Sequence, residues 1–298
     1  LLKTETMKLE IQDLSKRYGR DKFGLRDFSI TIDKGILGLL GPNGAGKSTL
    51  LQLIATIGKP TSGTIILNKN NTVKDPNYIR RQLGFLPQDF GVYPNLDAIE
   101  FLEYIAAMKG IGGKQLRTKI DLLLEGLNLS HAANKPIVSF SGGMKQRVGI
   151  AQALLNDPKI IIFDEPTVGL DPEERVRFRN LITDLANDCI VILSSHIVSD
   201  IDTIADKVAI MKNGTLLTHG SQEELIEMVK GRVFETSIEK EALSNFRASH
   251  LVVSTSRHAK NLKVRYITDK ATPYSIEKEA NLEDAYLFAT KTDTKQPL

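Results

Sequence analysis

A chain of 298 residues can bury a large core, and this length suits one large domain with or without a small second one. Charged residues make up 25% of the chain and hydrophobic residues 41%, which argues against a disordered or collagen-like protein. The net charge of +3 is too small to indicate a nucleic-acid partner. No uninterrupted apolar stretch is long enough for a membrane helix, so we expect a protein that is soluble or peripheral through a partner.

The first part of the chain reads as short strands that lead into a glycine-rich loop. Strand-like runs cover residues 8–14, 28–32, 36–40 and 64–67. The segment that follows the third run, GPNGAGKST at 41–49, fits the phosphate-binding pattern G-x-x-x-x-G-K-[ST]. A helix is expected from 47 to 57, ended by Gly58 and Pro60.

The residue types of this loop explain why it binds phosphate. Gly41, Gly44 and Gly46 allow backbone angles that turn successive N–H groups inward around an anion. Lys47 adds a positive charge, Ser48 can place its hydroxyl on Mg²⁺, and the start of the helix adds its positive dipole end. The competing interpretation is an ordinary glycine-rich turn between a strand and a helix.

The rest of the chain changes from helices to alternating strands and helices. Helical periodicity follows Gln88 and is interrupted by glycines near Gly110. Further helices are expected at 116–127, 142–155, 173–186 and 198–205, with strands at 160–163 and 189–193 and a hairpin at 207–218. The alternation predicts a mostly parallel sheet. The sequence pattern changes again past Gly231, where an expected strand at 262–268 and an expected helix at 282–290 indicate a small α+β domain.

Two further motifs carry chemistry. The apolar strand at 160–163 ends in Asp164 and Glu165, and adjacent carboxylates repel each other unless a cation is present. Mg²⁺·ATP supplies that cation: Asp164 would hold the Mg²⁺ and Glu165 would orient and deprotonate an attacking water. The alternative is a pair of solvated acids at a strand end. Ser141 is a good N-cap for the next glycine-rich helix start, where Gly142 and Gly143 let an anion approach bare N–H groups.

Taken in order, these motifs resemble those of the nucleotide-binding subunits of ATP-binding cassette (ABC) transporters. The resemblance spans residues 7–229 and implies an α/β P-loop ATPase domain with a mixed sheet and a helical subdomain at about 89–155. Residues 230–298 would then form the small C-terminal accessory domain. The implied ligands are ATP and Mg²⁺.

The resemblance also implies individual roles. Tyr18 would stack on adenine, Gln88 would contact Mg²⁺ or the attacking water, and His196 would contact the γ-phosphate. Catalysis would involve Glu165, His196, Gln88 and Lys47, and the metal would be held by Ser48, Gln88 and Asp164. The implied nucleotide-binding residues are Tyr18, Gly41, Pro42, Asn43, Gly44, Ala45, Gly46, Lys47, Ser48, Thr49, Ser141, Gly142, Gly143 and Asp171. Without the other motifs, Tyr18 would be read as a strand residue, Gln88 as a turn residue and His196 as a structural histidine. Asp171 also reads locally as a helix N-cap before Pro172.

One position departs from the family pattern. The signature usually reads Leu-Ser-Gly-Gly-Gln, and here Met144 replaces the glutamine. At the third helical position Gln could complete a capping box or reach the nucleotide, and Met can do neither. This variant resembles the exporter branch that moves drugs, antibiotics and polysaccharides. The segment 281–287 is similar to the end of many drug-exporter ATPases, although an amphipathic helix that packs on its own domain explains it equally well.

The function expected from the resemblance is the ATP-hydrolysing subunit of an exporter on the cytoplasmic face of the membrane. Two cassettes, identical or paralogous, would sandwich two ATP molecules and drive a separately encoded permease, with no nucleic-acid partner. The alternatives are a soluble ABC ATPase that acts on ribosomes or nucleic acid, and an importer subunit. The single phosphate loop and the short segment between Gln88 and Ser141 argue against the soluble classes, and no long regulatory barrel follows the cassette.

Overall fold

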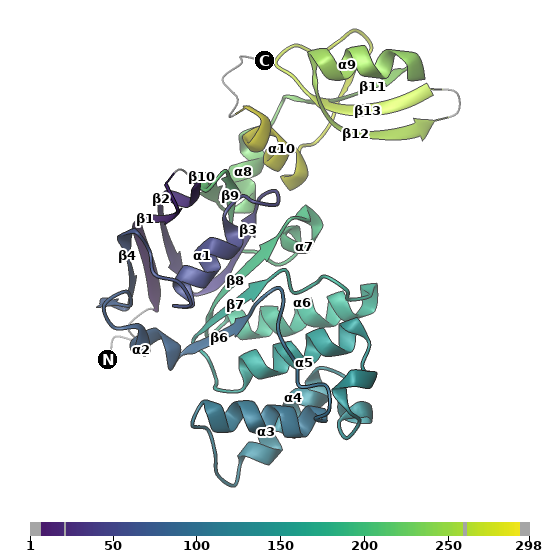
Figure 1. The fold of residues 1–298 in the computed structure, drawn as a ribbon. Coiled ribbons are helices and arrows are strands. Elements are labelled where there is room, and N and C mark those ends of the chain that lie inside the picture. The colour runs from purple at the N-terminus through teal and green to yellow at the C-terminus, as the bar shows by residue number, and fades with distance from the viewer. Residues whose placement is uncertain (1–6, 21, 259–260, 293–298) are drawn as a thin grey trace, which may run out of the picture.

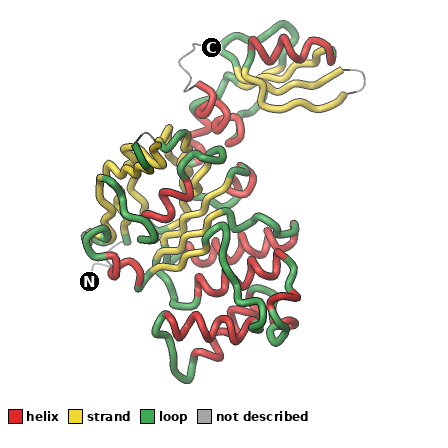
Figure 2. The backbone as a smooth tube through the Cα atoms, in the orientation of Figure 1, coloured by secondary structure: helices red, strands yellow, loops and turns green. Residues whose placement is uncertain are grey.

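The computed structural model describes residues 7–20, 22–258 and 261–292 (Figure 1). A large body is built around one central sheet, and a second, smaller body contains the last part of the chain. Helix α10 lies between the two bodies (Figure 1), and loops and short turns connect the elements throughout (Figure 2).

Six strands form the central sheet, in the order β10-β9-β3-β8-β7-β6. Their bounds are β3 Gly35–Leu40, β6 Leu83–Leu86, β7 Ile160–Asp164, β8 Ile190–Ser195, β9 Lys207–Lys212 and β10 Thr215–Gly220. All neighbours are parallel except β9 and β10, which form the predicted hairpin. The carboxyl ends of β3, β7 and β8 therefore meet at one edge, where open parallel sheets bind their ligands.

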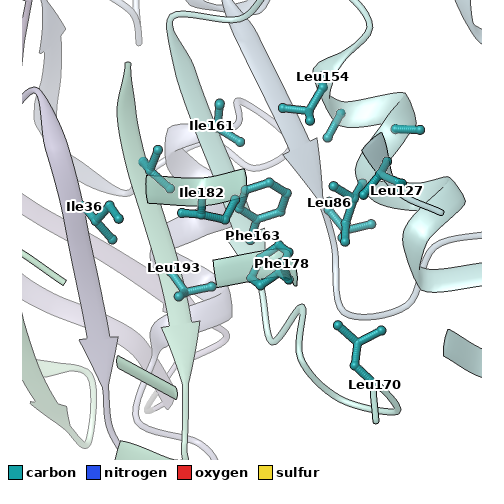
Figure 3. Packing of buried hydrophobic residues seen from close by; sticks show 14 of the residues in the cluster. Ile36, Leu86, Leu127, Leu154, Ile161, Phe163, Leu170, Phe178, Ile182 and Leu193 are labelled. Atoms are coloured by element: carbon teal, nitrogen blue, oxygen red, sulfur yellow. The ribbon is translucent and has the colours of Figure 1, made fainter. Parts of the chain in front are cut away.

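The core covers both faces of this sheet, which explains the continuous apolar runs in its strands. Along β7, Ile161 and Phe163 point into one hydrophobic cluster, and Ile160 and Ile162 point into the other. Phe163 packs edge to face on Phe178 of α6 (Pro172–Ala186), with the ring centroids 5.4 Å apart (Figure 3).

A second, antiparallel sheet packs over the face of the central sheet that carries α1 (Lys47–Ile54). Its strands are β1 Lys8–Tyr18, β2 Lys22–Asp33, β4 Ser62–Leu67 and β5 Asn70–Asn71, in the order β2-β1-β4-β5. Leu9 and Ile11 of β1 share a cluster with Leu50 and Leu51 of α1, all of them at most 2% exposed. This layer fixes α1, and with it the phosphate loop.

A helical region inserted between β6 and β7 contains the next group of elements. These are α3 Ala98–Met108, α4 Leu116–Gly126, α5 Gly142–Leu154 and the 3₁₀ turns Ser130–Ala132 and Ile137–Ser139. Asp97 begins α3 with a reciprocal capping box to Glu100. Ile99, Leu102 and Ala106 form the buried face of α3 and are at most 5% exposed.

Three short helices complete the large body: α2 Pro76–Arg80, α7 Val198–Asp202 and α8 Gln222–Glu227. Helix α7 lies directly on β3, where Ile201 packs over Gly38 so closely that any Cβ at residue 38 would clash with it. The segment after the carboxyl end of β8 is therefore held against the strand that precedes the phosphate loop.

The last part of the chain forms a four-stranded antiparallel sheet with two helices. The strands are β11 Val233–Ile238, β12 Leu251–His258, β13 Asn261–Ile267 and β14 Ile276–Glu277, in the order β12-β13-β11-β14. The helical elements are the 3₁₀ turn Lys240–Ala242, α9 Leu243–Ser249 and α10 Leu282–Thr292. Fully buried Tyr266 packs under Phe246 and His250 on one face, and Arg265 on β13 binds buried Asp284 of α10 at 2.9 Å.

Several boundaries differ from those predicted; β1, for example, extends to Tyr18 rather than 14, and β2 begins at Lys22 rather than 28. Helix α1 ends at Ile54 rather than 57, because Thr56 takes a left-handed conformation (φ 61°) that Arg80 holds through two hydrogen bonds. Helix α7 ends at Asp202, three residues early. Cys189 lies one residue before β8 and is buried there, with its thiol donating to the carbonyl of Pro158.

Candidate functional site

The phosphate loop runs from the end of β3 to the start of α1, and backbone crowding explains its glycines. Gly44 and Gly46 have φ angles of 80° and 100°, which only glycine adopts at no steric cost. A Cβ at residue 46 would lie 2.5 Å from the carbonyl oxygen of Gly24. The loop therefore depends on a close approach between its own backbone and that of β2.

Lys47, the first residue of α1, is only 5% exposed. Its ammonium group donates to the carbonyl oxygen of Gly41 at 2.6 Å and lies 4.0 Å from a carboxylate oxygen of Glu165. Burial lowers the pKa of Lys47, and the nearby carboxylates of Glu165 and Asp164 counteract part of that effect. A buried ammonium group at the start of a helix is suited to bind phosphate, because charged hydrogen bonds to phosphate are strong where water is largely excluded.

The two acids at the end of β7 are held by one serine of the neighbouring strand. Ser194 of β8 donates its hydroxyl to Asp164 at 2.5 Å and accepts the backbone N–H of Glu165 at 3.0 Å. Glu165 has a φ of 52°, a strained value for a residue with a side chain. The hydrogen bond between the Glu165 N–H and Ser194 of the neighbouring strand helps to stabilise this strained conformation. The chain leaves the sheet at Glu165, one residue after the end of β7.

His196 follows the end of β8 and faces the same acid. Its Nδ1 lies 3.1 Å from a carboxylate oxygen of Glu165, and its ring is 42% exposed, whereas the Glu165 side chain is 10% exposed. Lys47, Glu165 and His196 therefore come from three neighbouring elements and converge on one point.

These side chains open into a cleft of about 930 Å³. Of the predicted site residues, it is lined by Tyr18, Asn43, Gly44, Ala45, Gly46, Lys47, Ser48, Thr49, Gln88, Glu165 and His196. Gly41 and Pro42 support the cleft from behind through the carbonyl groups that bind Lys47. The structure thus gathers residues from positions 18 to 196 into one cavity.

Tyr18 lies at the rim of the cleft and is 44% exposed. The ring passes so close to Gly24 that a Cβ on that glycine would lie 2.5 Å from the ring edge. The ammonium group of Lys16 lies 5.4 Å from the ring centroid. A partly exposed aromatic ring at the mouth of a phosphate-binding cleft is suited to stack on a flat base.

Six predicted nucleotide-binding residues do not line this cleft: Gly41, Pro42, Ser141, Gly142, Gly143 and Asp171. The predicted metal ligand Asp164 does not line it either. Ser141 caps α5 as predicted, with its hydroxyl accepting the N–H of Met144 at 3.2 Å. Ser141 and Gly142 are exposed, and Gly143 is half-buried. Asp171 caps α6 in the same way, accepting the N–H of Glu174 at 2.9 Å, and is also exposed. We call the phosphate loop (residues 41–49) the first phosphate cradle and the start of α5 (residues 141–143) the second. The second cradle is therefore largely exposed and lies outside the cleft that contains the first.

The exposed start of α5 is nevertheless firmly anchored one turn later. Arg147 is 9% exposed, pairs with Glu174 of α6 at 3.2 Å, and donates to the carbonyl oxygens of Leu127 and Asn128. Gln146 donates to the carbonyl of Pro166. The helix start is therefore fixed relative to the segment that follows Glu165.

Comparison with known proteins identifies this arrangement. A family model described as ABC transporter matches residues 25–168. The chain is 38% identical over 233 residues to YxlF, an uncharacterised ABC transporter ATP-binding protein of Bacillus subtilis, across 78% of this chain and 77% of that protein. The chain belongs to the ABC transporter family of ATP-binding proteins.

Other ABC proteins agree with this assignment. The bacitracin transport ATP-binding protein BcrA of Bacillus licheniformis is 41% identical over 212 residues, across 70% of this chain and 68% of that protein. A dimeric bacterial ABC transporter cassette superimposes with a TM-score of 0.67 at 28% identity, covering 72% of this chain and 98% of that one. The predicted α/β P-loop ATPase fold is confirmed, and the chain is an ABC-type ATPase.

The donor atoms in the ABC cleft fit Mg²⁺ bound together with a nucleotide. Among the described residues, no group of three or more His, Cys, Asp or Glu could hold a metal ion. Nucleotide-bound Mg²⁺ needs only one or two carboxylates, because the phosphates and waters supply the remaining oxygens. The Ser48 hydroxyl and the Asp164 carboxylate are suitable oxygen donors. Ser48 lines the cleft, and Asp164 does not line it but ends β7 next to Glu165, which does.

Several residues of this ABC site were not predicted from the sequence. Lys22, Phe23, Gly24 and Val168 line the cleft, and Ser194 holds both acids. Of these, Ser194 had a sequence signal, because it lies two residues before His196. In the part of the chain that the structure describes, no helix is long and apolar enough to cross a membrane.

Proposed function

We propose that this chain is the ATP-hydrolysing subunit of an ABC exporter that works with a membrane permease. The observation that carries the proposal is the separation of the two cradles. One cleft holds Lys47, Glu165 and His196 together, whereas the Ser141 end of α5 is rigid, exposed and outside that cleft. A second cassette would be needed to bring a signature helix to each ATP.

In the proposed reaction, Lys47 and the loop amides bind the phosphates and Tyr18 stacks on adenine. Water attacks the γ-phosphorus, the bond to the ADP oxygen breaks, and Glu165 accepts the proton of the water. His196, at 3.1 Å, keeps the Glu165 carboxylate oriented and contacts the γ-phosphate. Gln88, at the cleft wall, would contact the water or the metal.

Mg²⁺, when bound, would neutralise phosphate charge during transfer. Asp164, Ser48 and Gln88 are the residues proposed to hold it. Ser194 keeps the Asp164 carboxylate oriented by its hydrogen bond, so its role in this site is to position an acid that binds the metal.

We propose that the partner cassette contributes its Ser141, Gly142 and Gly143 to the phosphates bound by this chain. The dimeric form of the structurally similar bacterial cassette supports this arrangement. Asp171 would lie beside the interface, because its cap fixes the exposed loop before α6.

Export is the transport direction that the relatives support. The name of BcrA describes bacitracin transport, and a relative from Bacillus subtilis, 32% identical over 225 residues, is named for linearmycin resistance. The proposed position is at the cytoplasmic face of the membrane, bound to the permease. We propose 7–229 as the ATPase domain and 230–298 as the accessory domain, of which 293–298 lie outside the described residues.

Purification of the full chain from detergent-solubilised membranes, followed by mass spectrometry of its partners, tests this proposal. We expect one polytopic membrane protein to co-purify and to stimulate ATP hydrolysis. In inside-out vesicles, ATP should drive cargo inward if the transporter exports. Co-purification with ribosomes, or ATP-driven movement out of these vesicles, would contradict the exporter assignment. The Lys47→Ala variant should bind the same partner without driving transport.

A further inference from the structure

The turn between β9 and β10 supports the phosphate loop from outside the cleft. The N–H of Gly214 donates to the carbonyl oxygen of Ala45 at 3.0 Å, and the carbonyl of Gly214 accepts the N–H of Arg26 at 2.7 Å. Gly214 also lies against Gly46, where a Cβ would be 3.2 Å from the Gly214 Cα. Residue 214 therefore bridges β2 and the phosphate loop.

The bond to Ala45 fixes the direction of a phosphate-binding group. The carbonyl of Ala45 and the N–H of Gly46 belong to one rigid trans peptide, so the two groups point in opposite directions. The carbonyl of Ala45 points toward Gly214, which binds it, so the N–H of Gly46 points to the opposite side of the loop. Rotation of this peptide is less restricted than that of an ordinary one at φ of Gly46, because Gly46 has no Cβ, and an external anchor therefore matters.

The same turn is held from its other side by α10. Lys212, the last residue of β9, donates from its ammonium group to the carbonyl oxygen of Thr290 at 2.5 Å. Thr290 lies in the last turn of α10, where the helix dipole favours a cation. The hydroxyl of Thr215 closes the turn by donating to the carbonyl of Lys212 at 2.8 Å.

We propose that Lys212 is a positioning residue for ATP binding. It does not line the cleft. It connects α10 to the Asn213-Gly214 turn, both residues of which have positive φ (51° and 79°), and this turn orients the Ala45–Gly46 peptide. The helix that ends the described chain thus supports the phosphate loop although Lys212 and Thr290 are 78 residues apart in sequence. This inference rests on the assignment of the loop as the ATP site.

The test compares three full-length variants by the Kd for a fluorescent ATP analogue with Mg²⁺ and by the kinetics of ATP hydrolysis. Lys212→Met removes the donor and keeps most of the aliphatic stem, whereas Lys212→Arg keeps a donor. Lys207→Met is the matched control, because Lys207 lies at the opposite end of β9 in an exposed ion pair with Asp33. We expect Lys212→Met to weaken binding and raise KM about threefold to tenfold with kcat nearly unchanged, since the charged hydrogen bond acts through one intervening turn.

Hydrogen exchange of the nucleotide-free protein provides a second measurement. Amides of residues 44–48 should exchange faster in Lys212→Met than in wild type, Lys212→Arg or Lys207→Met. Unchanged binding with a lowered melting temperature would overturn the proposal, since Lys212 would then be merely structural. Equal weakening in Lys212→Arg and Lys212→Met, or equal effects in Lys207→Met, would overturn it as well. Near-normal binding in Lys47→Ala would instead refute the ATP site itself.

Discussion

The two phosphate cradles of this chain use the same local device in different surroundings. Each places glycines at the start of a helix, so that free N–H groups face an anion. At the first cradle Ala45 is 1% and Lys47 5% exposed, and a base and a cation are already within 4.0 Å of each other. At the second cradle Ser141 and Gly142 are exposed, and neither of them carries a charge. These differences support the proposal that the first cradle carries out the chemistry and the second completes the site of a partner molecule.

The difference also lies in what holds each helix start. The phosphate loop is held by backbone contacts with β2 and with the β9–β10 turn. The start of α5 is held by the Arg147–Glu174 ion pair and by the hydrogen bonds of Arg147 to a neighbouring loop. Substitutions at the first cradle should therefore change chemistry and ATP binding, whereas those behind the second should change stability.

The largest effect is expected for Glu165→Gln. The amide keeps the shape and a hydrogen bond to His196 but cannot accept the proton of water. Loss of one well-placed group of this kind typically lowers the rate about 10²–10³-fold, roughly 3–4 kcal/mol in the barrier. Steady-state phosphate release measures the loss, and equilibrium binding of an ATP analogue should remain within about twofold of wild type. Hydrolysis at the wild-type rate would remove Glu165 as the base.

Arg147→Met should lower stability rather than chemistry. The change leaves the carboxylate of Glu174, 13% exposed, and two backbone carbonyls without their partner. Removal of one member of a largely buried pair costs about 2–4 kcal/mol, since some solvent reaches this one. Urea unfolding at pH 7 measures the change. The control is Arg177→Met on the exposed face of α6, for which we expect a change within about 0.5 kcal/mol. Equal stability of Arg147→Met and wild type would show that the pair does not anchor α5.

Mixing two inactive variants tests whether the cradles act across a dimer. Ser141→Arg blocks the second cradle and Lys47→Ala disables the first, so each alone should lack a complete site if the chain pairs with itself. In random mixtures half of the dimers combine both variants and contain one complete site, so roughly a quarter of wild-type ATPase activity should return. No recovery in a mixture that forms dimers would contradict the shared site.

The fold and the first cradle were predictable because their signals are local. The glycine pattern, the strand before it and the acids after β7 lie in short runs whose periodicity and residue types point to one structure. The supports of the cradle were not predictable, because Gly214 acts on Ala45 and Lys212 on Thr290 across long stretches of chain. The early end of α1 was not predictable for the same reason, because Thr56 is held by Arg80, which lies 24 residues away in sequence.

The smallest effect is expected for Met144→Gln, which tests whether a single added donor makes the second cradle bind phosphate more strongly. Met144 occupies the third position of α5, and its side chain packs against the main hydrophobic cluster. Gln at this position could complete a capping box with the backbone N–H of Ser141 but would lose apolar contact. We therefore expect Met144→Gln to change the free energy of unfolding by no more than about 0.5 kcal/mol.

If the second cradle binds the partner's nucleotide, Gln adds a donor there, and ATP-induced dimerisation of the Glu165→Gln form should become stronger. Analytical ultracentrifugation with ATP measures this, and Met144→Leu is the matched control because it keeps the apolar contact and adds no donor. A gain of the same size in Met144→Leu would mean that packing, rather than a new donor to phosphate, sets the strength of this cradle.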